Sequence, residues 1–205
     1  MLTLEPAEMV RAAGRLTELV FTHEYGNVPW LLVRLAPGDN ELAAALHAAD
    51  ANAAAVRPPG QIAFHTEAVS EGPLRLKRNG APPADPERTS LIQSLGNERY
   101  HVVPVSKRTD VDAVFGERVS IGRALNKDIV LRHTSISKFH AYFHQTEPDR
   151  CTLADADSKN GTLVNGTRLK PKDPVEVASG DRVTFGSIST VVLDARGLWR
   201  VLRAR

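Results

Sequence analysis

The chain has 205 residues, of which 42% are hydrophobic, enough to form a core and to argue against global disorder. Its formal net charge of +2 divides into −4 for residues 1–98 (8 Lys and Arg, 12 Asp and Glu) and +6 for residues 99–205 (18 and 12). The positive charge of residues 99–205 is small and the basic residues are scattered, so we expect no nucleic-acid partner. The single cysteine, Cys151, excludes an internal disulfide and a cysteine-based zinc site.

The N-terminal half is predicted to be mostly helical, with some extended structure. An apolar residue recurs every three or four positions after Pro6, which predicts one amphipathic helix with this buried face: Met9, Ala13, Leu16 and Val20. Residues 24–27 should end that helix, and residues 28–35 predict a strand. The alanine-rich segment 41–56 predicts a second helix with Asn40 as its N-cap.

A linker is predicted at residues 79–90, which contain three prolines, few apolar residues and charges of both signs. We place a domain boundary near residue 95. It separates an N-terminal domain (1–95), mostly helical or α+β and of unknown role, from a C-terminal domain (96–205).

The C-terminal domain is predicted to be a mainly β, antiparallel sandwich, because many short β-rich runs alternate with turn residues. These runs cover residues 100–105, 118–122, 128–131, 139–145, 151–155, 175–177, 181–186, 189–194 and 198–203. In residues 139–145, apolar Phe139, Ala141 and Phe143 alternate with polar neighbours, as in a half-buried strand.

Two kinds of catalytic or metal chemistry are considered and disfavoured. Ser137 and His140 suggest a hydrolase pair, but residues three apart on a strand face opposite sides, and no nucleophile elbow surrounds Ser137. His140 and His144 would share a strand face, yet no further ligand pattern accompanies them. Nucleotide-binding glycine motifs are absent as well, so we expect no cofactor and no metal.

Polar loop residues suggest a different chemistry. Loops at one end of a sandwich cluster, and the predicted loops carry Arg123, Ser137 with Lys138, and Lys159 with Asn160. A guanidinium, a hydroxyl and an ammonium can donate to one anion, while an asparagine can hold a peptide main chain. From spacing alone, the favoured interpretation is that these are ordinary exposed loop residues.

Five short motifs in order resemble the forkhead-associated (FHA) domain over roughly residues 99–205. They are Gly122-Arg123, Ser135-x-Ser137-x-x-His140, Asn160-Gly161-Thr162, Asn165-Gly166 and residues 179–186. The resemblance implies an eleven-stranded sandwich that binds phosphothreonine peptides through loops at one end. It also implies a Ser/Thr kinase, or a substrate of one, as the partner.

The resemblance further implies a role for each matching residue. Arg123 and Ser137 would bind the phosphate, Lys138 would lie beside it, and Asn160 would hold the peptide main chain. Ser135 would help to select the residue three positions after the phosphothreonine. Lys159 stands where many members have threonine, so it would add a cation. The structural residues around the site would be Gly122, His140, Gly161, Asn165 and Gly166.

We therefore expect a cytoplasmic, non-enzymatic signalling adaptor that binds phosphothreonine, with no membrane partner, because no secretory signal or membrane-spanning apolar stretch is visible. The alternative is a scaffold that uses the same sandwich without phosphate. An enzyme within residues 1–95 has little support, since the histidines there, His23, His47 and His65, show no catalytic spacing. Thr89, in the linker, could be a phosphorylated self-ligand.

Overall fold

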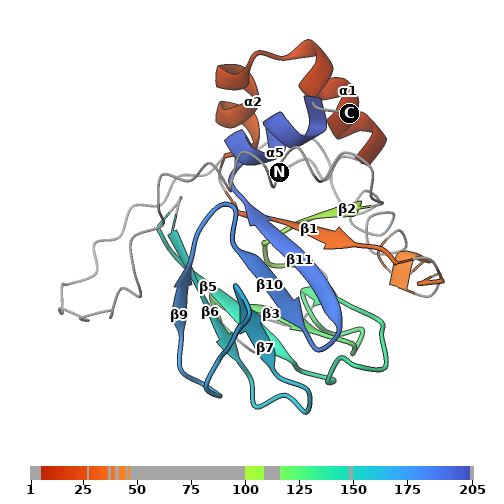
Figure 1. Cartoon of the computed structure of the whole chain (residues 1–205). Helices are drawn as coiled ribbons and strands as arrows, with labels where there is room; N and C mark the ends of the chain where they lie inside the picture. Colours follow the sequence, from red (N-terminus) through yellow and green to blue (C-terminus); the bar gives the residue numbers. More distant parts are fainter. Residues whose placement is uncertain are drawn as a thin grey trace.

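The computed structural model shows two β-sheets packed face to face, with helices at one end (Figure 1). It describes residues 6–26, 28–36, 38–39, 42–44, 46, 100–108, 116–147 and 150–203. The predicted linker, Thr89, Asn40 and most of the predicted helix at 41–56 lie outside these residues.

One sheet has six strands in the order β2-β1-β11-β10-β7-β8 and the other has five in the order β4-β3-β5-β6-β9. The first contains β1 (Trp30–Arg34), β2 (Tyr100–Pro104), β7 (Thr162–Val164), β8 (Thr167–Arg168), β10 (Arg182–Phe185) and β11 (Ile188–Leu193). The second contains β3 (Val119–Gly122), β4 (Ile129–Val130), β5 (Ala141–Glu147), β6 (Arg150–Asp155) and β9 (Val175–Val177). Neighbouring strands are antiparallel except β3 and β4, so the predicted antiparallel sandwich is confirmed apart from this pair.

The main core lies between the two sheets, because the strands direct alternate apolar side chains inward. Ile121, Phe143 and Leu153 from the five-stranded sheet are fully buried with Val183 and Phe185 from the six-stranded sheet. Leu42 and Leu46 join the same core. Residues 42–44 and 46 are helical, in agreement with the prediction for this part of the chain.

Strand β1 joins the N-terminal region to the sandwich. The predicted strand at 28–35 is confirmed, and it lies between β2 and β11, with Val33 opposite Thr190 and Arg34 opposite Tyr100. The sandwich is therefore not confined to residues 96–205, and the chain between Arg34 and Tyr100 is inserted between two adjacent strands.

The single helix predicted after Pro6 is two helices, α1 (Pro6–Arg15) and α2 (Glu18–Tyr25). Thr17 has an extended backbone, and its hydroxyl accepts a hydrogen bond from the Val20 amide, so it begins a new helix. The buried face of the new helix is therefore rotated relative to the face that the sequence pattern predicts for one continuous helix. Val20 is therefore 47% exposed, and Phe21 and Tyr25 are buried in its place.

The strand predicted at 198–203 is wrong, because these residues belong to helix α5 (Ala195–Arg203). The Asp194 carboxylate accepts a hydrogen bond from the Gly197 amide at 2.7 Å and caps the helix. Leu198, Val201 and Leu202 are buried at the spacing of one helical face. The apolar run was therefore the buried side of a helix.

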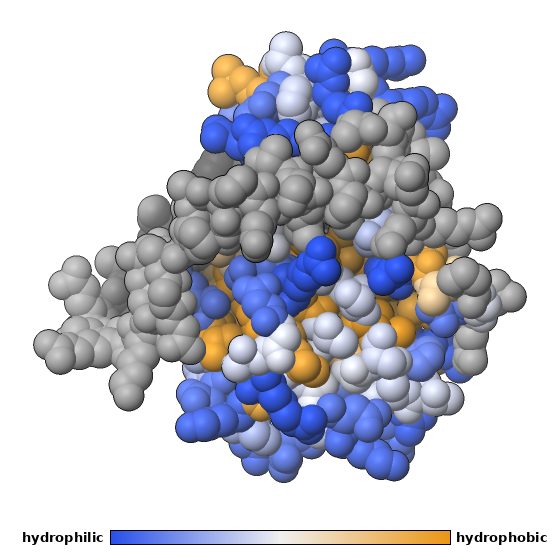
Figure 2. Space-filling model, in the orientation of Figure 1, coloured by the Kyte–Doolittle hydropathy of each residue, from blue (hydrophilic) through white to orange (hydrophobic). Residues whose placement is uncertain are grey.

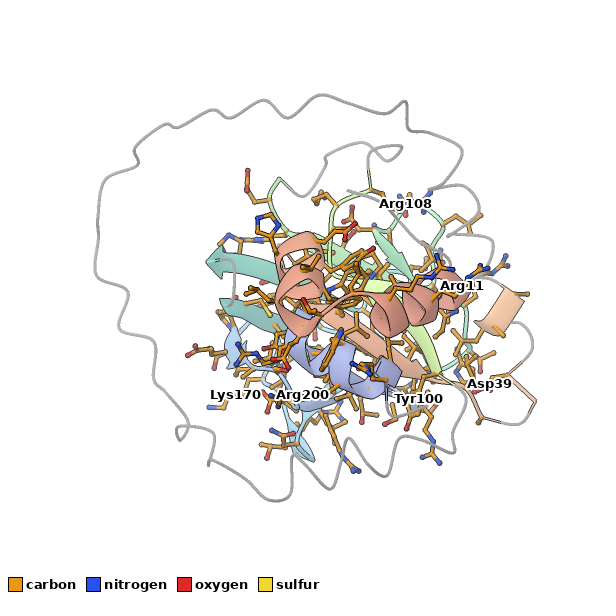
Figure 3. The ribbon with its side chains drawn as sticks, turned by 90° about the horizontal axis from the view of Figure 1, so that it is seen from above. Arg11, Asp39, Tyr100, Arg108, Lys170 and Arg200 are labelled. Carbon is orange, nitrogen blue, oxygen red and sulfur yellow. The ribbon has the colours of Figure 1, made fainter. Side chains whose placement is uncertain are left out.

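Helices α1, α2 and α5 form a second apolar cluster against the outer side of β1 and β11, with Phe21, Trp30 and Leu198 among its members. Hydrophilic side chains cover much of the outside of the helical end (Figure 2), and in Figure 3 the helices lie over the sandwich. Within the described part of the chain, no helix has the length and apolar character needed to cross a membrane.

Candidate functional site

The predicted site residues lie on loops at the end of the sandwich opposite the helices. These loops follow β3, connect β4 to β5 and connect β6 to β7. The β10–β11 turn meets them, and β11 then runs along the sheet to α5 at the other end (Figure 1). The fold therefore separates the site from the helices by about the length of β11.

Gly122 and Arg123 connect the end of β3 to the loop that carries Ser137. The Arg123 amide donates to the Ser137 carbonyl at 3.0 Å, and a Cβ at Gly122 would overlap the Lys138 carbonyl oxygen. Only glycine permits this close approach. The Arg123 side chain is exposed, and no carboxylate among the described residues forms an ion pair with it.

His140 braces two of the loops from inside the protein. Its buried ring accepts a hydrogen bond from the Ser137 amide at Nδ1 (3.1 Å), so the ring proton is at Nε2, which donates to the Gly161 carbonyl (3.2 Å). Burial lowers the pKa of His140, although the Gly161 hydrogen bond and the charge of Asp155 oppose this shift. His140 is therefore a neutral connector, the structural position predicted for it.

Ser137 and His140 do not form a nucleophile–base pair in this structure. His140 contacts the amide of Ser137, and the Ser137 hydroxyl instead accepts a hydrogen bond from the Lys159 amide. His140 precedes β5 and is buried while His144 is exposed, so the predicted shared strand face is wrong. Among the described residues, no three His, Cys, Asp or Glu side chains could together hold a metal ion.

The loop with the first Asn-Gly pair is held by buried Asp155. Its carboxylate accepts hydrogen bonds from the Ser158 amide (2.9 Å), the Ser158 hydroxyl (2.7 Å) and the Thr162 hydroxyl (2.7 Å). The Ser158 hydroxyl in turn accepts from the Gly161 amide (2.9 Å). The sequence analysis did not single out Asp155 and Ser158, although an aspartate side chain commonly accepts hydrogen bonds from nearby backbone amides in turns.

Lys159 and Asn160 connect that loop to the Ser137 loop. The Lys159 amide donates to the Ser137 hydroxyl at 3.1 Å, and Asn160 Nδ2 donates to the Ser135 carbonyl at 2.7 Å. Gly161 has φ +80°, and a Cβ there would overlap the Arg168 guanidinium. The side chains of Lys159 and Asn160 remain exposed.

Ser135 faces its own loop neighbours. Its hydroxyl lies 2.8 Å from His133 Nδ1 and accepts hydrogen bonds from the Ser187 amide (3.1 Å) and hydroxyl (2.8 Å). Gly186 (φ +57°) is needed beside it, because a Cβ there would lie 2.6 Å from the Ser135 carbonyl oxygen. The proposed selection role of Ser135 stays a prediction. The sequence analysis did not predict the contact with Ser187, because Ser187 lies 52 residues after Ser135.

The second Asn-Gly pair is the hairpin turn between β7 and β8, as predicted. Asn165 and Gly166 have φ values of +50° and +80°, which such a tight turn requires. The Asn165 side chain accepts from the Arg182 amide (2.9 Å) and donates to Asp181 (3.0 Å). Its contacts are all with its own sheet.

The site is cationic and rich in donors. Exposed basic side chains surround it: Arg123, Arg132, Lys138, Lys159 and Arg168. Arg123 lines a small hollow of about 130 Å³ together with the neighbouring loop. The arrangement offers a forked guanidinium, a hydroxyl and ammonium groups to a tetrahedral anion, with an amide group beside them.

Comparisons with known proteins agree with this geometry. Residues 119–186 match the family model of the FHA domain. The DNA damage response protein kinase DUN1 of Saccharomyces cerevisiae is 41% identical over 128 residues, which cover 60% of this chain and 23% of that protein. The ABC transporter ATP-binding/permease protein Rv1747 of Mycobacterium tuberculosis is 41% identical over 76 residues, which cover 37% of this chain and 8% of that protein.

Among solved structures, the FHA domain of the CT664 protein from Chlamydia trachomatis is similar, with 22% identity and a TM-score of 0.38 over 46% of this chain and 85% of that one. The chain spans only 6% to 23% of the lengths of the curated relatives named DUN1, PS1, Rv1747 and rnf8. The matched segment contains each of the three loops described above. Residues 119–186 of this chain are therefore identified as an FHA domain, and the match does not extend to the rest of the chain.

Proposed function

We propose that this chain is a non-enzymatic adaptor that binds a phosphothreonine peptide and so reads the output of a Ser/Thr kinase. FHA domains generally bind phosphothreonine peptides in kinase signalling. The observation that carries the proposal is that three loops, hydrogen-bonded to one another, present Arg123, Ser137 and Asn160 at one end of the sandwich.

The phosphate would be held by groups whose other hydrogen bonds are already satisfied. Because the Ser137 hydroxyl accepts from the Lys159 amide, its own proton is available to a phosphate oxygen. The exposed Arg123 guanidinium can donate two parallel hydrogen bonds to the other oxygens. The ammonium groups of Lys138 and Lys159 add positive charge nearby.

The peptide main chain would be held by Asn160. One N–H of its amide group donates to the Ser135 carbonyl, which fixes the orientation of the side chain. The amide oxygen and the second N–H then remain for the peptide backbone. Lys159 places a cation where the FHA resemblance predicts a threonine hydroxyl, so phosphate binding at this position would depend on charge more than on a directed hydrogen bond.

An oriented library of phosphothreonine peptides, with an unphosphorylated copy as control, tests the proposal. We expect binding of the phosphorylated peptides alone, and a rise in melting temperature when an enriched peptide is added, because a ligand that binds only the folded state stabilises it. Equal binding of the unphosphorylated copy would instead indicate the phosphate-independent scaffold.

A further inference from the structure

A pocket at the helical end of the molecule has no part in the proposed function. It has a volume of about 300 Å³ and lies where α2 and the start of α5 meet the ends of β9 and β11 (Figure 1). Val28, Cys151, Val177 and Leu193 are among the described residues that line it, and each of them is at most 9% exposed. Since a cavity of about 150 Å³ can bind benzene, this pocket has room for a leucine or an aromatic side chain.

The pocket offers apolar contact rather than free hydrogen-bonding groups. Burial raises the pKa of the Cys151 thiol to about 12, so the thiol is neutral. The Thr22 hydroxyl donates to the Glu18 carbonyl (2.7 Å), and the Ser179 hydroxyl donates to the Asp194 carboxylate (2.8 Å). Because these polar groups of the lining already have partners in the protein, the pocket suits an apolar side chain.

A row of arginines begins at this pocket and follows α5. Arg196, Arg200 and Arg203 are exposed and lie at the spacing of one helical face, and Arg196 also lines the pocket. The Glu18 carboxylate lies 3.0 Å from Arg196 and 3.9 Å from Arg200. The Arg203 guanidinium lies over the Trp199 ring, 5.1 Å from its centroid. Three guanidinium groups thus share one carboxylate, and the row keeps a net positive charge.

The shape and the charge of this surface together define its ligand. The Asp194 carboxylate disfavours a second carboxylate at the pocket itself, so an apolar residue of a ligand belongs in the pocket and its acidic residues belong beside the row. From Arg196 to Arg203 the helix rises about 10 Å, which an extended peptide covers in about three residues. A short peptide segment can therefore occupy the pocket and the row at once.

We propose that the pocket and the arginine row form a second docking site, which binds an acidic peptide segment. One large apolar side chain of the segment enters the pocket, and its carboxylates lie beside Arg200 and Arg203, while Arg196 keeps its contact with Glu18. A buried apolar anchor with charged groups around it is a common arrangement at protein interfaces. The inference goes beyond the proposed function, because this site is at the end of the sandwich opposite Arg123 and needs no phosphate. An adaptor with a ligand at each end can hold two partners together.

The test measures the binding of dye-labelled, unphosphorylated peptides to the full chain by fluorescence anisotropy. The probe has one central leucine between two runs of four glutamates, so that acidic residues reach the row whichever way the peptide runs. One matched peptide replaces the leucine with serine, and another replaces every glutamate with glutamine.

Two changes in the chain alter the two parts of the site. Thr22→Phe places a large side chain in the lining of the pocket, and the double variant Arg200→Gln, Arg203→Gln removes two cations of the row. The matched control for the pocket is His23→Phe, at the next and exposed position of α2, which does not line the pocket. The matched control for the row is Lys170→Gln, which removes an exposed cation just after β8.

The wild type should bind the leucine peptide about tenfold more tightly than the serine peptide, because burial of a leucine side chain is lost in the latter. It should bind the glutamine peptide about fivefold more weakly, since several exposed ion pairs are lost. Thr22→Phe should weaken binding of the leucine peptide about tenfold and the double variant about fivefold, with both controls within about twofold of the wild type. Melting temperatures check that each variant is folded.

Equal affinity for the leucine and serine peptides, or unchanged affinity in both Thr22→Phe and the double variant, would overturn the docking site. Loss of binding in Arg123→Gln but not in the double variant would place the peptide at the loop end and overturn it as well. Binding of anionic lipid vesicles that depends on Arg200 and Arg203, without binding of the peptides, would assign the row to a membrane instead. Because the probes carry no phosphate, failure of phosphothreonine recognition would leave the docking site standing.

Discussion

The two ends of the sandwich use their buried groups differently. At the loop end, the buried polar residue His140 joins two loops by hydrogen bonds, and buried Asp155 holds the loop that follows β6. At the helical end, apolar side chains such as Phe21 and Leu198 pack against each other. The loop end thus holds a precise arrangement of exposed donors, and the helical end supplies buried apolar surface. Binding and stability should therefore respond to different substitutions.

Strand β1 contributes side chains to both the helical cluster and the main core. Its Trp30 side chain belongs to the helical cluster and donates from Nε1 to the Tyr25 carbonyl at 3.1 Å, while its Leu31 and Val33 side chains belong to the main core. Residues before the predicted linker therefore contribute to the stability of the domain that carries the site.

The largest effect on stability is expected from Leu198→Ala on α5. Leu198 is fully buried in the helical cluster, and removal of a buried leucine side chain costs about 2–5 kcal/mol of unfolding free energy. Chemical denaturation measures this loss. The remaining folded protein should bind a phosphothreonine peptide with nearly unchanged affinity, and a large loss of affinity would show that the two ends are coupled.

The loop end should make stability depend on pH through His140. Because burial lowers its pKa in the folded state, the unfolded state takes up the proton first as pH falls below about 6.5. The free energy of unfolding should then fall, by at most about 1.4 kcal/mol per pH unit, until the folded-state pKa is reached. His140→Asn should lack this slope between pH 7 and 5, and His144→Ala, which alters an exposed histidine, should keep it.

Asp128, at the end of the loop that follows β3, supplies a second acid-sensitive group. Burial would raise its pKa, but hydrogen bonds from Ser120, Arg108 and Lys107 together lower it. Its stabilising contribution is present above about pH 4 and is lost as pH falls further. A slope that persists unchanged from pH 7 to 5 in His140→Asn would therefore contradict the role given to His140.

Alanine substitutions in the two Asn-Gly pairs should have opposite effects, one on stability and the other on peptide binding. Asn165→Ala places alanine at positive φ and removes two side-chain hydrogen bonds, so stability should fall by about 1–3 kcal/mol with little change in binding. Asn165→Gly keeps the turn and should lose less. Asn160→Ala should weaken peptide binding about tenfold with a small change in melting temperature, because it removes only one exposed hydrogen bond. If Asn160→Ala mainly lowered stability and Asn165→Ala mainly weakened binding, the roles given to the two turns would be wrong.

The smallest effect is expected from Lys159→Thr, which replaces the ammonium group with the hydroxyl that the FHA resemblance predicts at this position. The Lys159 amide makes the structural hydrogen bond, so the loop should keep its shape. An exposed ammonium contributes modestly, and the affinity for a phosphothreonine peptide should change by about threefold or less. Titration at two salt concentrations measures this, and a change above tenfold would show that Lys159 makes a directed contact.

The sequence predicted most strands after residue 100 because their apolar residues alternate or form short runs between turn residues. It misread 198–203, where a short window of apolar residues did not reveal the Asp194 cap and the helical spacing. The place of β1 could not be predicted, because its partner β2 begins only at Tyr100. Such pairing depends on contacts far apart in sequence.

The candidate site was predicted from short motifs, and the structure brings Arg123, Ser137 and Asn160 to one end of the sandwich. The supporting contacts were not visible in the motifs. The Ser135–Ser187 hydrogen bonds join residues 52 positions apart, which only the folded chain brings together. Local chemistry thus indicated which side chains form the candidate site, and nonlocal packing determines how they are held.

The most direct test of the account compares the wild type with Arg123→Ala by calorimetry, using one phosphothreonine peptide and its unphosphorylated copy. Loss of a charged, forked hydrogen-bond donor costs about 1.5–3 kcal/mol or more, so the affinity for the phosphorylated peptide should fall at least tenfold. The melting temperature should stay close to that of the wild type, since the guanidinium is exposed and makes no ion pair among the described residues. Unchanged affinity in Arg123→Ala, or equal binding of both peptides by the wild type, would contradict phosphothreonine recognition at this site.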